Sequence, residues 1–575
     1  MKKIQASLAM IKVLESWGID HVYGIPADTI NSFVDGLSKT QSNVKFIQVR
    51  HEEVGALAAS AEAKLSGKAA VVFGSGGPGA THLINGLYDA HMDRVPVIAL
   101  MGQVKSGKIN RDAMQAINEH SLYQSISCYN RTAMTAQSLP HLLNEAIKSA
   151  YKHGGVATLE IPVDYGDEEI DDVDVSTAQL FQKNLPDPQR PMLEKALPLI
   201  QNAKQPVLFF GRGLKDGAAA IKRFSDYFSI PVISSSLAKG ILPDDWKNYL
   251  GSSARLGTKP ANEALAVADL IILAGSDYPF ASAFFNPNAK VIQIDVDPSK
   301  FGRRHPAEVA ILGDAAKSLA YLVEMGEKRP HDKWLQATND NMKNWCAWLQ
   351  GFENRQDQPL FPDPIYKAIN QLATPETIFI TDVGNTTIHS TQLLKMNGKQ
   401  LHTISGWFAT MGYGIPGGIG AQLAFPERQV ITLSGDGAFS MVMQDLLTQV
   451  KYHLPVINFV FSNGSLGFIE SEQEDENFAV YGTKLQEADF AAVARGLGAT
   501  GFTISNYDEI AVVFEKIKHS KEPVVVDVKL SNKRPLPVDQ LKLDPQKFKE
   551  EEISDFKKTY EVENMPILSE LLEGN

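Results

Sequence analysis

The chain has 575 residues, about four times a common domain length, which predicts two to four domains with full hydrophobic cores. It carries 55 basic against 67 acidic residues, a formal net charge of −12, and this excludes a broadly basic nucleic-acid binder. Apolar content of 44% and charged content of 21% are ordinary globular values, which excludes disorder, collagen and coiled coil as descriptions of the whole chain.

The two cysteines, Cys128 and Cys346, lie far apart and outside any CxxC pattern, which excludes a disulfide framework and a structural zinc site. The amino-terminal stretch MKKIQASLAMIKVLESWGID resembles a signal peptide only in its lysines. Polar residues interrupt the apolar run, and the apolar residues share one helical face: Ile4, Leu8, Ile11 and Leu14. We expect an amphipathic helix here. No later run reaches the roughly 18 apolar residues that span a bilayer, so we expect a cytoplasmic protein.

Apolar strands alternate with helix-length segments in three regions, which is the α/β pattern. The first region, residues 1–180, contains HVYGIP, VKFIQV, AAVVFG, PVIALMG and VATLEIPVD. The second, residues 190–345, contains PVLFFG, PVISSS, LIILAG and KVIQIDVD. The third, residues 360–535, contains TIFITDVG, QVITLSGDG, PVINFVFSN and PVVVDVKL. Polar, proline-bearing linkers separate the regions, and a charged helical tail, residues 536–575, ends the chain.

These strands are apolar on both faces and do not alternate, which favours parallel sheets covered by helices on each side. The predicted fold class is therefore α/β, with three domains, each a parallel sheet flanked by helices on both faces. Binding sites in such sheets lie at the carboxyl ends of the strands.

The strongest site signal lies in the third region. A strand ends in Gly435-Asp436-Gly437-Ala438, and 24 residues separate Gly437 from Ser462-Asn463 at the end of the next predicted strand. Glycines let backbone approach a diphosphate closely. The carboxylate of Asp436 and the amide oxygen of Asn463 are ligands that Mg²⁺ prefers. A lone Gly-Asp-Gly is often only a turn, but the spaced pair predicts a metal-diphosphate site.

This spaced pair resembles the signature of thiamine diphosphate-dependent enzymes, which usually closes with Asn-Asn. Ser462 stands at the first of these positions, and Asn463 is retained at the ligand position. The resemblance implies that Asp436, Asn463 and the backbone carbonyl of Ser465 hold Mg²⁺, and that Gly435, Gly437 and Ala438 contact the diphosphate. It assigns the third region to the diphosphate and Mg²⁺, and the first region to the pyrimidine of thiamine.

In the first region a strand leads into His51-Glu52-Glu53 and a helix of small residues. A carboxylate at the apolar start of a helix can hold a raised pKa and share a proton. From the residues alone, Glu52 and Glu53 are equal candidates. The stretch is similar to the family's Arg-His-Glu segment, which implies that Glu52 exchanges a proton with the aminopyrimidine of thiamine and leaves Glu53 as a charge at the helix amino terminus.

The stretch Gly74-Ser75-Gly76-Gly77-Pro78-Gly79 matches GxGxxG, a nicotinamide-dinucleotide pattern. Pro78 is unusual in that pattern, and no strand-end acid follows about 20 residues on. The stretch instead resembles the glycine-rich loop of the family's pyrimidine-binding domain. His82 follows it on a helix; the residue type alone indicates a helix-face histidine, and the resemblance implies that it faces substrate.

The stretch ISGWFATMGYGIPGGIG precedes the Gly-Asp-Gly strand. The resemblance implies that Met411 wedges between the two rings of thiamine and that the backbone carbonyl of Ala409 accepts from its pyrimidine amine. Met alone would be core filler. Val383 and Gly384 end another strand, on the predicted diphosphate side.

The second region resembles the FAD-binding middle domain of pyruvate oxidases and acetolactate synthases. An acid at a strand end can bind ribose hydroxyls, and Arg with glycine turns can hold a pyrophosphate. Each feature alone is a common α/β turn. Together they imply these FAD contacts: Gly211, Gly213, Arg255, Gly275, Asp277, Asp295, Asp314 and Ala315.

Similarity over nearly the whole chain is closest to the pyruvate oxidase family, in which pyruvate, phosphate and O₂ give acetyl phosphate, CO₂ and H₂O₂. The resemblance places Gln115, Phe468, Ile469 and Glu472 near the reacting carbon. Relatives usually carry Phe where this chain has Met114, between thiamine and flavin. Met is flexible and apolar, so packing can survive while the electron-transfer rate or substrate range differs.

The alternatives are an acetolactate synthase with a structural FAD and a quinone-dependent pyruvate dehydrogenase, which needs a lipid-binding tail. The tail here is not basic enough to favour an anionic membrane surface, and we expect no stable membrane association. A catalytically silent binding protein and a plain NAD-dependent dehydrogenase are further alternatives. In this family thiamine lies between two subunits, which implies at least a homodimer and, by family expectation, a tetramer.

Overall fold

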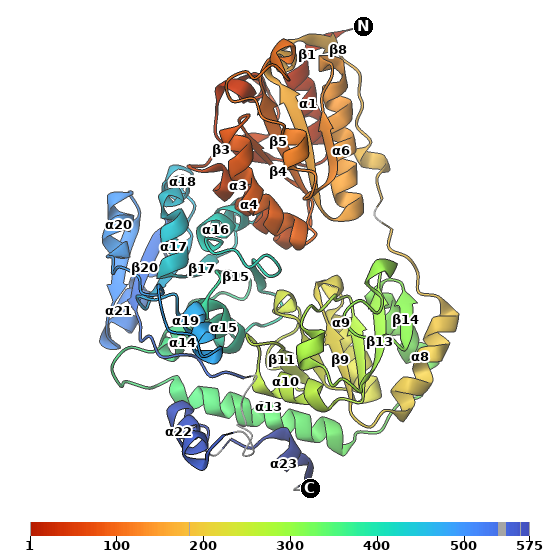
Figure 1. The fold of residues 1–575 in the computed structure, drawn as a ribbon, viewed down its shortest axis with the longest axis vertical. Coiled ribbons are helices and arrows are strands. Elements are labelled where there is room, and N and C mark those ends of the chain that lie inside the picture. Colours follow the sequence, from red (N-terminus) through yellow and green to blue (C-terminus); the bar gives the residue numbers. More distant parts are fainter. Residues whose placement is uncertain (1, 183, 539–547, 564, 574–575) are drawn as a thin grey trace.

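The computed structural model describes residues 2–182, 184–538, 548–563 and 565–573. Three six-stranded sheets, each with every neighbouring pair of strands parallel, form the three domains seen in Figure 1. Helices cover both faces of each sheet, and the predicted α/β class is confirmed. The part of the predicted tail at residues 539–547 lies outside the described residues.

The first sheet has the order β3-β2-β4-β5-β7-β6. Helices α1 (Ala6–Ser16) and α6 (Leu139–His153) pack on one face, and α3 (Glu52–Ser66) and α4 (Pro78–Met92) pack on the other. The strands are β2 (His21–Gly24), β3 (Lys45–Gln48), β4 (Ala70–Gly74), β5 (Val97–Gln103), β6 (Ser127–Thr132) and β7 (Val156–Pro162). Ile4, expected on the first helix, lies instead in β1 (Lys3–Gln5), which pairs antiparallel with β8 (Glu169–Asp171).

The middle sheet has the order β11-β10-β9-β12-β13-β14. One face carries α8 (Arg190–Asn202), α9 (Ala218–Phe228) and α12 (Ala315–Met325); the other carries α10 (Lys259–Val267) and the start of α13 (Lys333–Phe352). Its strands are β9 (Pro206–Phe210), β10 (Val232–Ser234), β11 (Tyr249–Ser252), β12 (Leu270–Ala274), β13 (Lys290–Asp295) and β14 (Val309–Leu312).

The third sheet has the order β16-β15-β17-β18-β20-β19. One face carries α14 (Pro362–Leu372) and α21 (Asp508–Ile517); the other carries α16 (Gly414–Ala424), α17 (Asp436–Val442) and α20 (Phe490–Gly496). Its strands are β15 (Ile378–Thr381), β16 (Leu401–Ile404), β17 (Val430–Gly435), β18 (Ile457–Ser462), β19 (Thr500–Ile504) and β20 (Val524–Lys529).

The first and third domains share one continuous hydrophobic core across α3 and α16. Small residues allow this, because a Cβ added at Gly420 would lie 2.3 Å from the carbonyl oxygen of Ala58. The same junction buries Lys64, whose Nζ lies 2.6 Å from both Asp89 and Asp93 and donates to the Ile404 carbonyl of the third domain at 3.1 Å. Packing and a buried ion pair therefore fix these two domains relative to each other.

The middle domain is fixed to the first domain at the carboxyl ends of α3 and α4. Lys215 donates to the Leu65 carbonyl at 2.7 Å, and Arg212 donates to the Asp93 carbonyl. Cations at helix carboxyl termini complement the unpaired carbonyls there.

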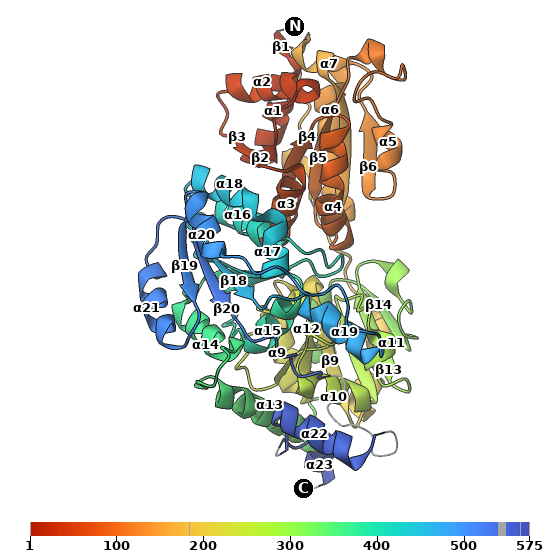
Figure 2. The same cartoon turned by 60° about the vertical axis from the view of Figure 1, so that its left-hand side comes forward.

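The chain ends beneath the middle domain, where α22 (Glu550–Tyr560) and α23 (Leu568–Glu573) lie along α13 in Figures 1 and 2. The apolar side of α23 packs on α10 and α13 with Leu568 buried, and the buried Lys259 donates to the Pro566 carbonyl at 2.7 Å. The helix α23 thus packs on the protein. Across the described residues, every helix is too short or too polar to cross a membrane.

Candidate functional site

A cavity of about 840 Å³ opens at the carboxyl ends of β15, β17 and β18. It is lined by most of the third-domain residues that the sequence singles out: Val383, Gly384, Met411, Gly435, Asp436, Gly437, Ala438, Asn463, Ser465, Phe468 and Ile469. The adjacency of these three strands in a parallel sheet brings segments that are 80 residues apart in the chain to one edge.

The oxygen ligands predicted for Mg²⁺ lie on the two loops that follow β17 and β18. Asp436 accepts from the Gly464 amide at 2.8 Å through Oδ2 and from its neighbouring Gly437 amide at 3.0 Å through Oδ1. Asn463 accepts from the Ser465 amide at 3.2 Å. These bonds hold a carboxylate, an amide oxygen and a backbone carbonyl on adjoining loops, and this hard-oxygen set fits Mg²⁺.

Glycines form an open cradle beside these ligands. Gly384 has φ 136°, and a Cβ added there or at Gly435 would meet nothing within 4 Å. Neither glycine is therefore required by packing against protein. Both line the cavity, where a side chain would occupy space that a diphosphate needs. The buried Oδ1 of Asn385, which lines the same cavity, has no partner among the described residues, and the site fits a polar ligand.

Asp382 anchors the turn that carries Met411, although the sequence predicted it only as part of the strand end Asp382-Val383-Gly384-Asn385 on the diphosphate side. This carboxylate is fully buried and accepts from the backbone amides of Val383, Gly412, Tyr413 and Gly414 at 2.8–3.0 Å and from the Ser434 hydroxyl at 3.1 Å. It thereby ties the loops after β15 and β17 to the turn at residues 409–414. Its place at the end of β15 was the only sequence signal.

The turn at residues 409–414 is strained at Ala409, the residue whose backbone carbonyl is predicted to contact the pyrimidine amine of thiamine. Ala409 has φ 56° without being a glycine, and Gly412 follows with φ 86°. Such a left-handed non-glycine residue costs free energy and is held by its surroundings. Met411 faces the cavity, with its methyl group 3.2 Å from the position of a Cβ on Gly437.

Glu52 and Glu53 differ clearly in their burial and in their hydrogen-bond partners. Glu52, the first residue of α3, is 7% exposed and accepts from or donates to the His82 Nδ1 at 2.9 Å. Glu53 is more exposed and accepts from Asn85 at 2.6 Å. The aromatic rings of His51 and His82 stack at 4.4 Å. Burial against a histidine therefore distinguishes Glu52, which the sequence alone could not.

Within one chain, Glu52 does not reach the third-domain cavity. Every described residue lining that cavity lies at or after Phe361, whereas Glu52 and His82 belong to α3 and α4. Gln115 and Met114 also lie in the first domain, on an exposed turn where the Met114 side chain is 80% exposed. The structure brings together the residues predicted to bind the metal and the diphosphate but leaves the first-domain residues apart from them.

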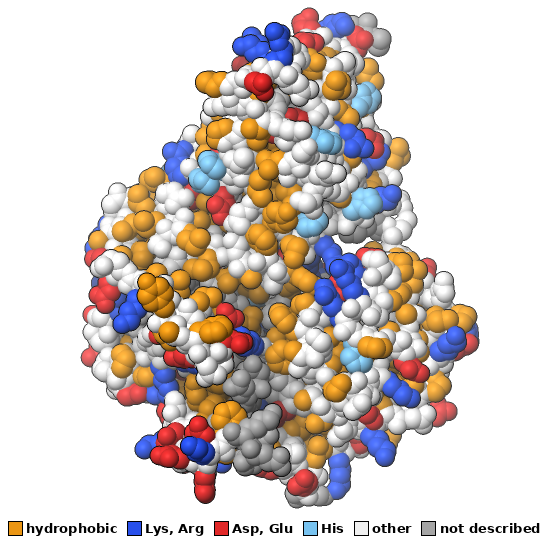
Figure 3. Space-filling view, viewed as in Figure 1, with side chains coloured by type: hydrophobic (Ala, Val, Ile, Leu, Met, Phe, Trp, Pro, Cys, Tyr) orange, Lys and Arg blue, Asp and Glu red, His pale blue; other side chains and the backbone are white. Residues whose placement is uncertain are grey.

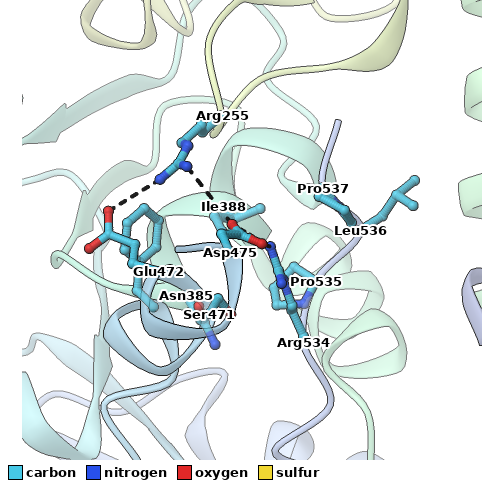
Figure 4. Close-up of a pocket in the computed structure, with 11 residues that line it drawn as sticks. Arg255, Asn385, Ile388, Ser471, Glu472, Asp475, Arg534, Pro535, Leu536 and Pro537 are labelled. Carbon is cyan, nitrogen blue, oxygen red and sulfur yellow. Dashed lines mark hydrogen bonds and ion pairs between the residues drawn. The ribbon is translucent and has the colours of Figure 1, made fainter. Parts of the chain in front are cut away.

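Arg255 and Glu472, predicted for FAD and substrate, meet at a second pocket of about 380 Å³ (Figure 4). Arg255 Nη1 lies 3.3 Å from Glu472, and its Nη2 lies 3.8 Å from Asp475. Arg534 binds Asp475 from the other side at 2.6 and 2.7 Å. The helix α19 (Gly467–Asp475) is thus held between the middle domain and the segment after β20. Phe468 lines both pockets, so the pockets adjoin.

The predicted FAD glycines have a packing reason in the structure. A Cβ added at Gly211 or Gly213 would lie 2.5–2.7 Å from backbone atoms of Gly275, so these glycines let the turns after β9 and β12 pack backbone to backbone. Asp314 caps α12 by accepting from the Lys317 amide at 2.8 Å, and Ala315 lies in the middle-domain core. Asp295 accepts from the Asp297 amide at 2.9 Å, and burial raises its pKa. Their FAD contacts stay predictions.

Asp277 lies in a cationic cluster that the sequence analysis missed. Its carboxylate is 3.0 Å from Arg94, 3.3 Å from Arg304, 3.7 Å from Arg303 and 4.0 Å from Lys300. Figure 3 shows Lys and Arg side chains gathered in the notch between the first and middle domains. Asp297 also pairs with Lys300 at 3.6 Å, so four cations face two carboxylates, and the remaining positive charge fits the pyrophosphate of a dinucleotide. The Arg303-Arg304 doublet after IDVDP was the available signal.

Comparison with known proteins agrees with this geometry. Three domain descriptions match the chain: thiamine pyrophosphate enzyme, N-terminal TPP binding domain, at residues 4–122; central domain, at 193–322; and C-terminal TPP binding domain, at 382–528. A pyruvate oxidase of Lactiplantibacillus plantarum is 44% identical over 99% of this chain and 96% of its own length. The Bacillus subtilis protein YdaP, whose description names thiamine pyrophosphate, is 41% identical over 92% of each chain.

More distant relatives include the acetolactate synthase large subunit of Parasynechococcus marenigrum, 30% identical over 92% of this chain and 87% of its own length. The chain belongs to the thiamine pyrophosphate enzymes, thiamine pyrophosphate being another name for thiamine diphosphate. Thiamine diphosphate, Mg²⁺ and FAD are the usual cofactors of this family.

Proposed function

We propose that this enzyme oxidatively decarboxylates pyruvate: pyruvate, hydrogen phosphate, O₂ and one proton give acetyl phosphate, CO₂ and H₂O₂. The observation that carries the proposal is 44% identity to a pyruvate oxidase along nearly the whole chain. The cavity with its oxygen ligands and the cationic cluster of the middle domain support it, because they fit a metal diphosphate and a dinucleotide in separate domains.

The domain assignment follows as part of the proposal. Residues 1–180 bind the pyrimidine of thiamine, 190–345 bind FAD, and 360–535 bind the diphosphate with Mg²⁺; residues 536–575 form the tail. Asp436, Asn463 and the Ser465 carbonyl would hold Mg²⁺. The Asp277 cluster would hold the FAD pyrophosphate, with Arg255 and the strand-end turns of the middle domain around the rest of that cofactor.

When bound, thiamine supplies an electron sink for loss of CO₂, and the flavin accepts two electrons. The chain's own residues orient the bound groups and exchange a proton with the aminopyrimidine. Glu52 holds a proton that it exchanges with N1′ of the aminopyrimidine, and His82 keeps the Glu52 carboxylate in place through its Nδ1. Met411 and the Ala409 carbonyl orient the thiamine rings. Gln115, Phe468, Ile469 and Glu472 surround the substrate, and Met114 lies towards the flavin.

The active site is completed by a second copy of the chain. Glu52 and the third-domain cavity lie apart within one chain, and both the first and the third domain expose large apolar side chains: Met114 80%, Phe478 68% and Tyr481 85%. A homodimer would cover these side chains and place Glu52 of one copy over the cavity of the other; a tetramer is the family expectation.

A mixing experiment tests this arrangement. Glu52→Gln and Asp436→Asn would each inactivate a homodimer. Unfolding and refolding the two variants together would give heterodimers in which one site carries both substitutions and the other carries neither, so activity returns. A monomer in analytical ultracentrifugation that is fully active would overturn the proposal.

Turnover by purified protein tests the reaction. The assay contains pyruvate, thiamine diphosphate, Mg²⁺ and FAD in air, with and without phosphate. Acetyl phosphate and H₂O₂ formed together only with phosphate are the expected result. With a quinone added to the assay, acetate formed together with reduced quinone and without H₂O₂ would indicate a quinone-dependent dehydrogenase.

Acetolactate synthase is the second candidate, because relatives of that name are 30% identical over most of the chain. Acetolactate without H₂O₂ in the same assay would assign the chain to that activity and make the flavin structural.

A further inference from the structure

Two loops of the first domain carry the residues that face the reaction under the proposed function, and they touch backbone to backbone. The glycine-rich loop leads into α4, which carries His82. The turn at residues 109–118 carries Met114 and Gln115. A Cβ added at Gly77 would lie 2.7 Å from the Gln115 carbonyl oxygen, so no side chain fits between the loops.

The turn at 109–118 is strained. Asn110, Asp112 and Gln115 have φ of 60°, 50° and 66°, although none is a glycine. Left-handed non-glycine residues cost free energy and persist only where surrounding contacts hold them. A fastening at the end of the turn is therefore needed to keep Gln115 in place.

Glu119 lies at that end, as the first residue of α5 (Glu119–Leu122), and is fully buried. Its Oε1 accepts from the Gly77 amide at 3.1 Å, so the side chain crosses from the turn to the glycine-rich loop. The adjoining Gly76 amide donates to the Thr29 hydroxyl at 2.7 Å. The Ile117 carbonyl, two residues before Glu119, accepts from Gln103 at 3.3 Å.

The other oxygen of Glu119 is buried and has no partner among the described residues. An ionised carboxylate in this setting is costly, whereas a neutral carboxylic acid still accepts one hydrogen bond through its carbonyl oxygen. Among the described residues, the carboxyl group of Glu160 on β7 acts electrostatically on Glu119; Glu160 itself accepts from Gln103 and Thr132. Tyr123 follows α5 directly and donates to the Ala80 carbonyl; burial, then Glu119 and Glu52, raise the pKa of its hydroxyl. Burial, and then the Glu160 carboxylate, raise the pKa of Glu119 to about 9.

We propose that Glu119, as a neutral acid, is a positioning residue that fastens the glycine-rich loop to the Met114–Gln115 turn. Its carboxyl group thereby sets the position of His82, and through it Glu52, relative to Gln115. The proposal rests on the proposed function for its consequence in catalysis, but the fastening itself does not. Glu119 need not touch substrate or cofactor.

Glu119→Gln and Glu119→Ala separate the two parts of this proposal. Gln has nearly the shape of a neutral Glu and keeps an acceptor for the Gly77 amide, whereas Ala removes it. The matched control is Glu145→Gln, which alters an exposed glutamate paired with Lys148 on α6. All variants are compared as holoprotein with thiamine diphosphate, Mg²⁺ and FAD.

Amide hydrogen exchange is the first readout, because it needs no activity. Glu119→Ala should speed exchange about ten-fold in both 74–80 and 109–118, while Glu119→Gln and the control stay near wild type. Unchanged exchange in Glu119→Ala would overturn the fastening. If exchange in Glu119→Gln at pH 7 were as fast as in Glu119→Ala, the proposal that Glu119 is a neutral acid would be overturned.

The second readout is catalytic. Because displacement of a positioned group by about 1 Å can cost 10²-fold, Glu119→Ala should lower kcat/KM for pyruvate by about 10–10²-fold without changing the thiamine diphosphate Kd, and Glu119→Gln should restore it. Wild-type kcat/KM in Glu119→Ala would overturn the proposal. Absence of pyruvate turnover in the wild type would count against the proposed function alone, since the exchange result still decides the role of Glu119.

The pH dependence of unfolding gives a third readout. An unfolded Glu releases its proton near pH 4.3, whereas folded Glu119 keeps it until about pH 9, so this residue costs stability as the pH rises between these values. Glu119→Gln should therefore gain in Tm relative to wild type between pH 6 and pH 9, while Glu145→Gln should not. A difference in Tm between Glu119→Gln and wild type that does not change with pH would contradict the proposal that Glu119 is a neutral acid.

Discussion

Removal of the Asp382 carboxylate should disable the thiamine site without touching a predicted ligand. Asp382 is fully buried and satisfies four backbone amides and one hydroxyl. Each buried donor left without a partner costs about 1–3 kcal/mol. These terms are not additive between neighbours, so we expect Asp382→Ala to destabilise the third domain by about 4–5 kcal/mol, the upper end for single substitutions.

Asp382→Asn should lower the free energy of unfolding by less than Asp382→Ala, because Asn can keep most of these hydrogen bonds. Three amides, those of Val383, Gly412 and Tyr413, converge on Oδ1, which the Asn carbonyl oxygen can replace. The Asn amino group would then face the Gly414 amide, a donor against a donor, while the Ser434 hydroxyl can rotate to accept. One buried donor left without a hydrogen-bond partner predicts a loss of about 1–3 kcal/mol in the free energy of unfolding.

Thermal unfolding and titration with thiamine diphosphate check both values. For a domain of this size, about 2–4 °C of Tm corresponds to 1 kcal/mol, so the third-domain transition should fall by about 8–20 °C in Asp382→Ala and by less in Asp382→Asn. Both variants should bind thiamine diphosphate more weakly, because the turn at 409–414 loses its anchor. Asp340→Asn, which alters a partly exposed aspartate paired with Lys343, is the control. An Asp382→Ala protein with wild-type Tm and wild-type Kd would refute this account of the turn.

Three further outcomes are expected. Glu52→Gln should lower kcat by about 10²–10⁴-fold, the range for loss of general acid–base catalysis, with the thiamine diphosphate Kd unchanged in calorimetry; a loss below five-fold would contradict the role of Glu52. Asp436→Asn should release thiamine diphosphate on gel filtration while the flavin absorbance at 450 nm stays, since FAD is assigned to another domain; loss of both cofactors together would contradict that separation. Burial lowers the pKa of His21, but Glu62 and Asp20 overcome this and raise it to about 10. Because the unfolded value is near 6.5, this charge stabilises the fold fully below about pH 6.5 and stops doing so as the pH rises towards 10. His21→Gln should flatten the fall of Tm over that range, and an unchanged slope would refute the assignment.

Local pattern predicted every interior strand of the three sheets and the edge strand β3, but it missed the other edge strands. The thirteen strands named from the sequence all form, and the five missed in the three large sheets, β6, β11, β14, β16 and β19, lie at sheet edges. An interior strand is covered on both faces and reads as a continuous apolar run. An edge strand such as β6, SCYNRT, has polar and half-exposed side chains, and its pairing is decided by the strand beside it.

The residues of the candidate site likewise include some that the sequence could predict and some that only the packing identifies. Gly-Asp-Gly and Ser-Asn were predictable because strand ends in a parallel sheet meet at one edge, so two segments of known spacing specify one location. The cationic partners of Asp277 were not, because Arg94 reaches it from another domain. The anchoring role of Asp382 and the role of Glu119 were likewise not predictable, since an acid at a strand end or helix start is common and only burial distinguishes these two.

The sequence therefore determined the three parallel sheets. It also predicted the metal and diphosphate residues and, with the family resemblance, predicted Glu52 over Glu53. These depend on residue type and spacing along single strands and turns. The tertiary structure alone decided that Glu52 is buried while Glu53 is not, that four cations surround one aspartate, and that Glu119 spans two loops. Those features depend on which segments distant in the chain are packed together, because burial and the neighbouring charges that set a group's protonation exist only once the domains are folded against one another.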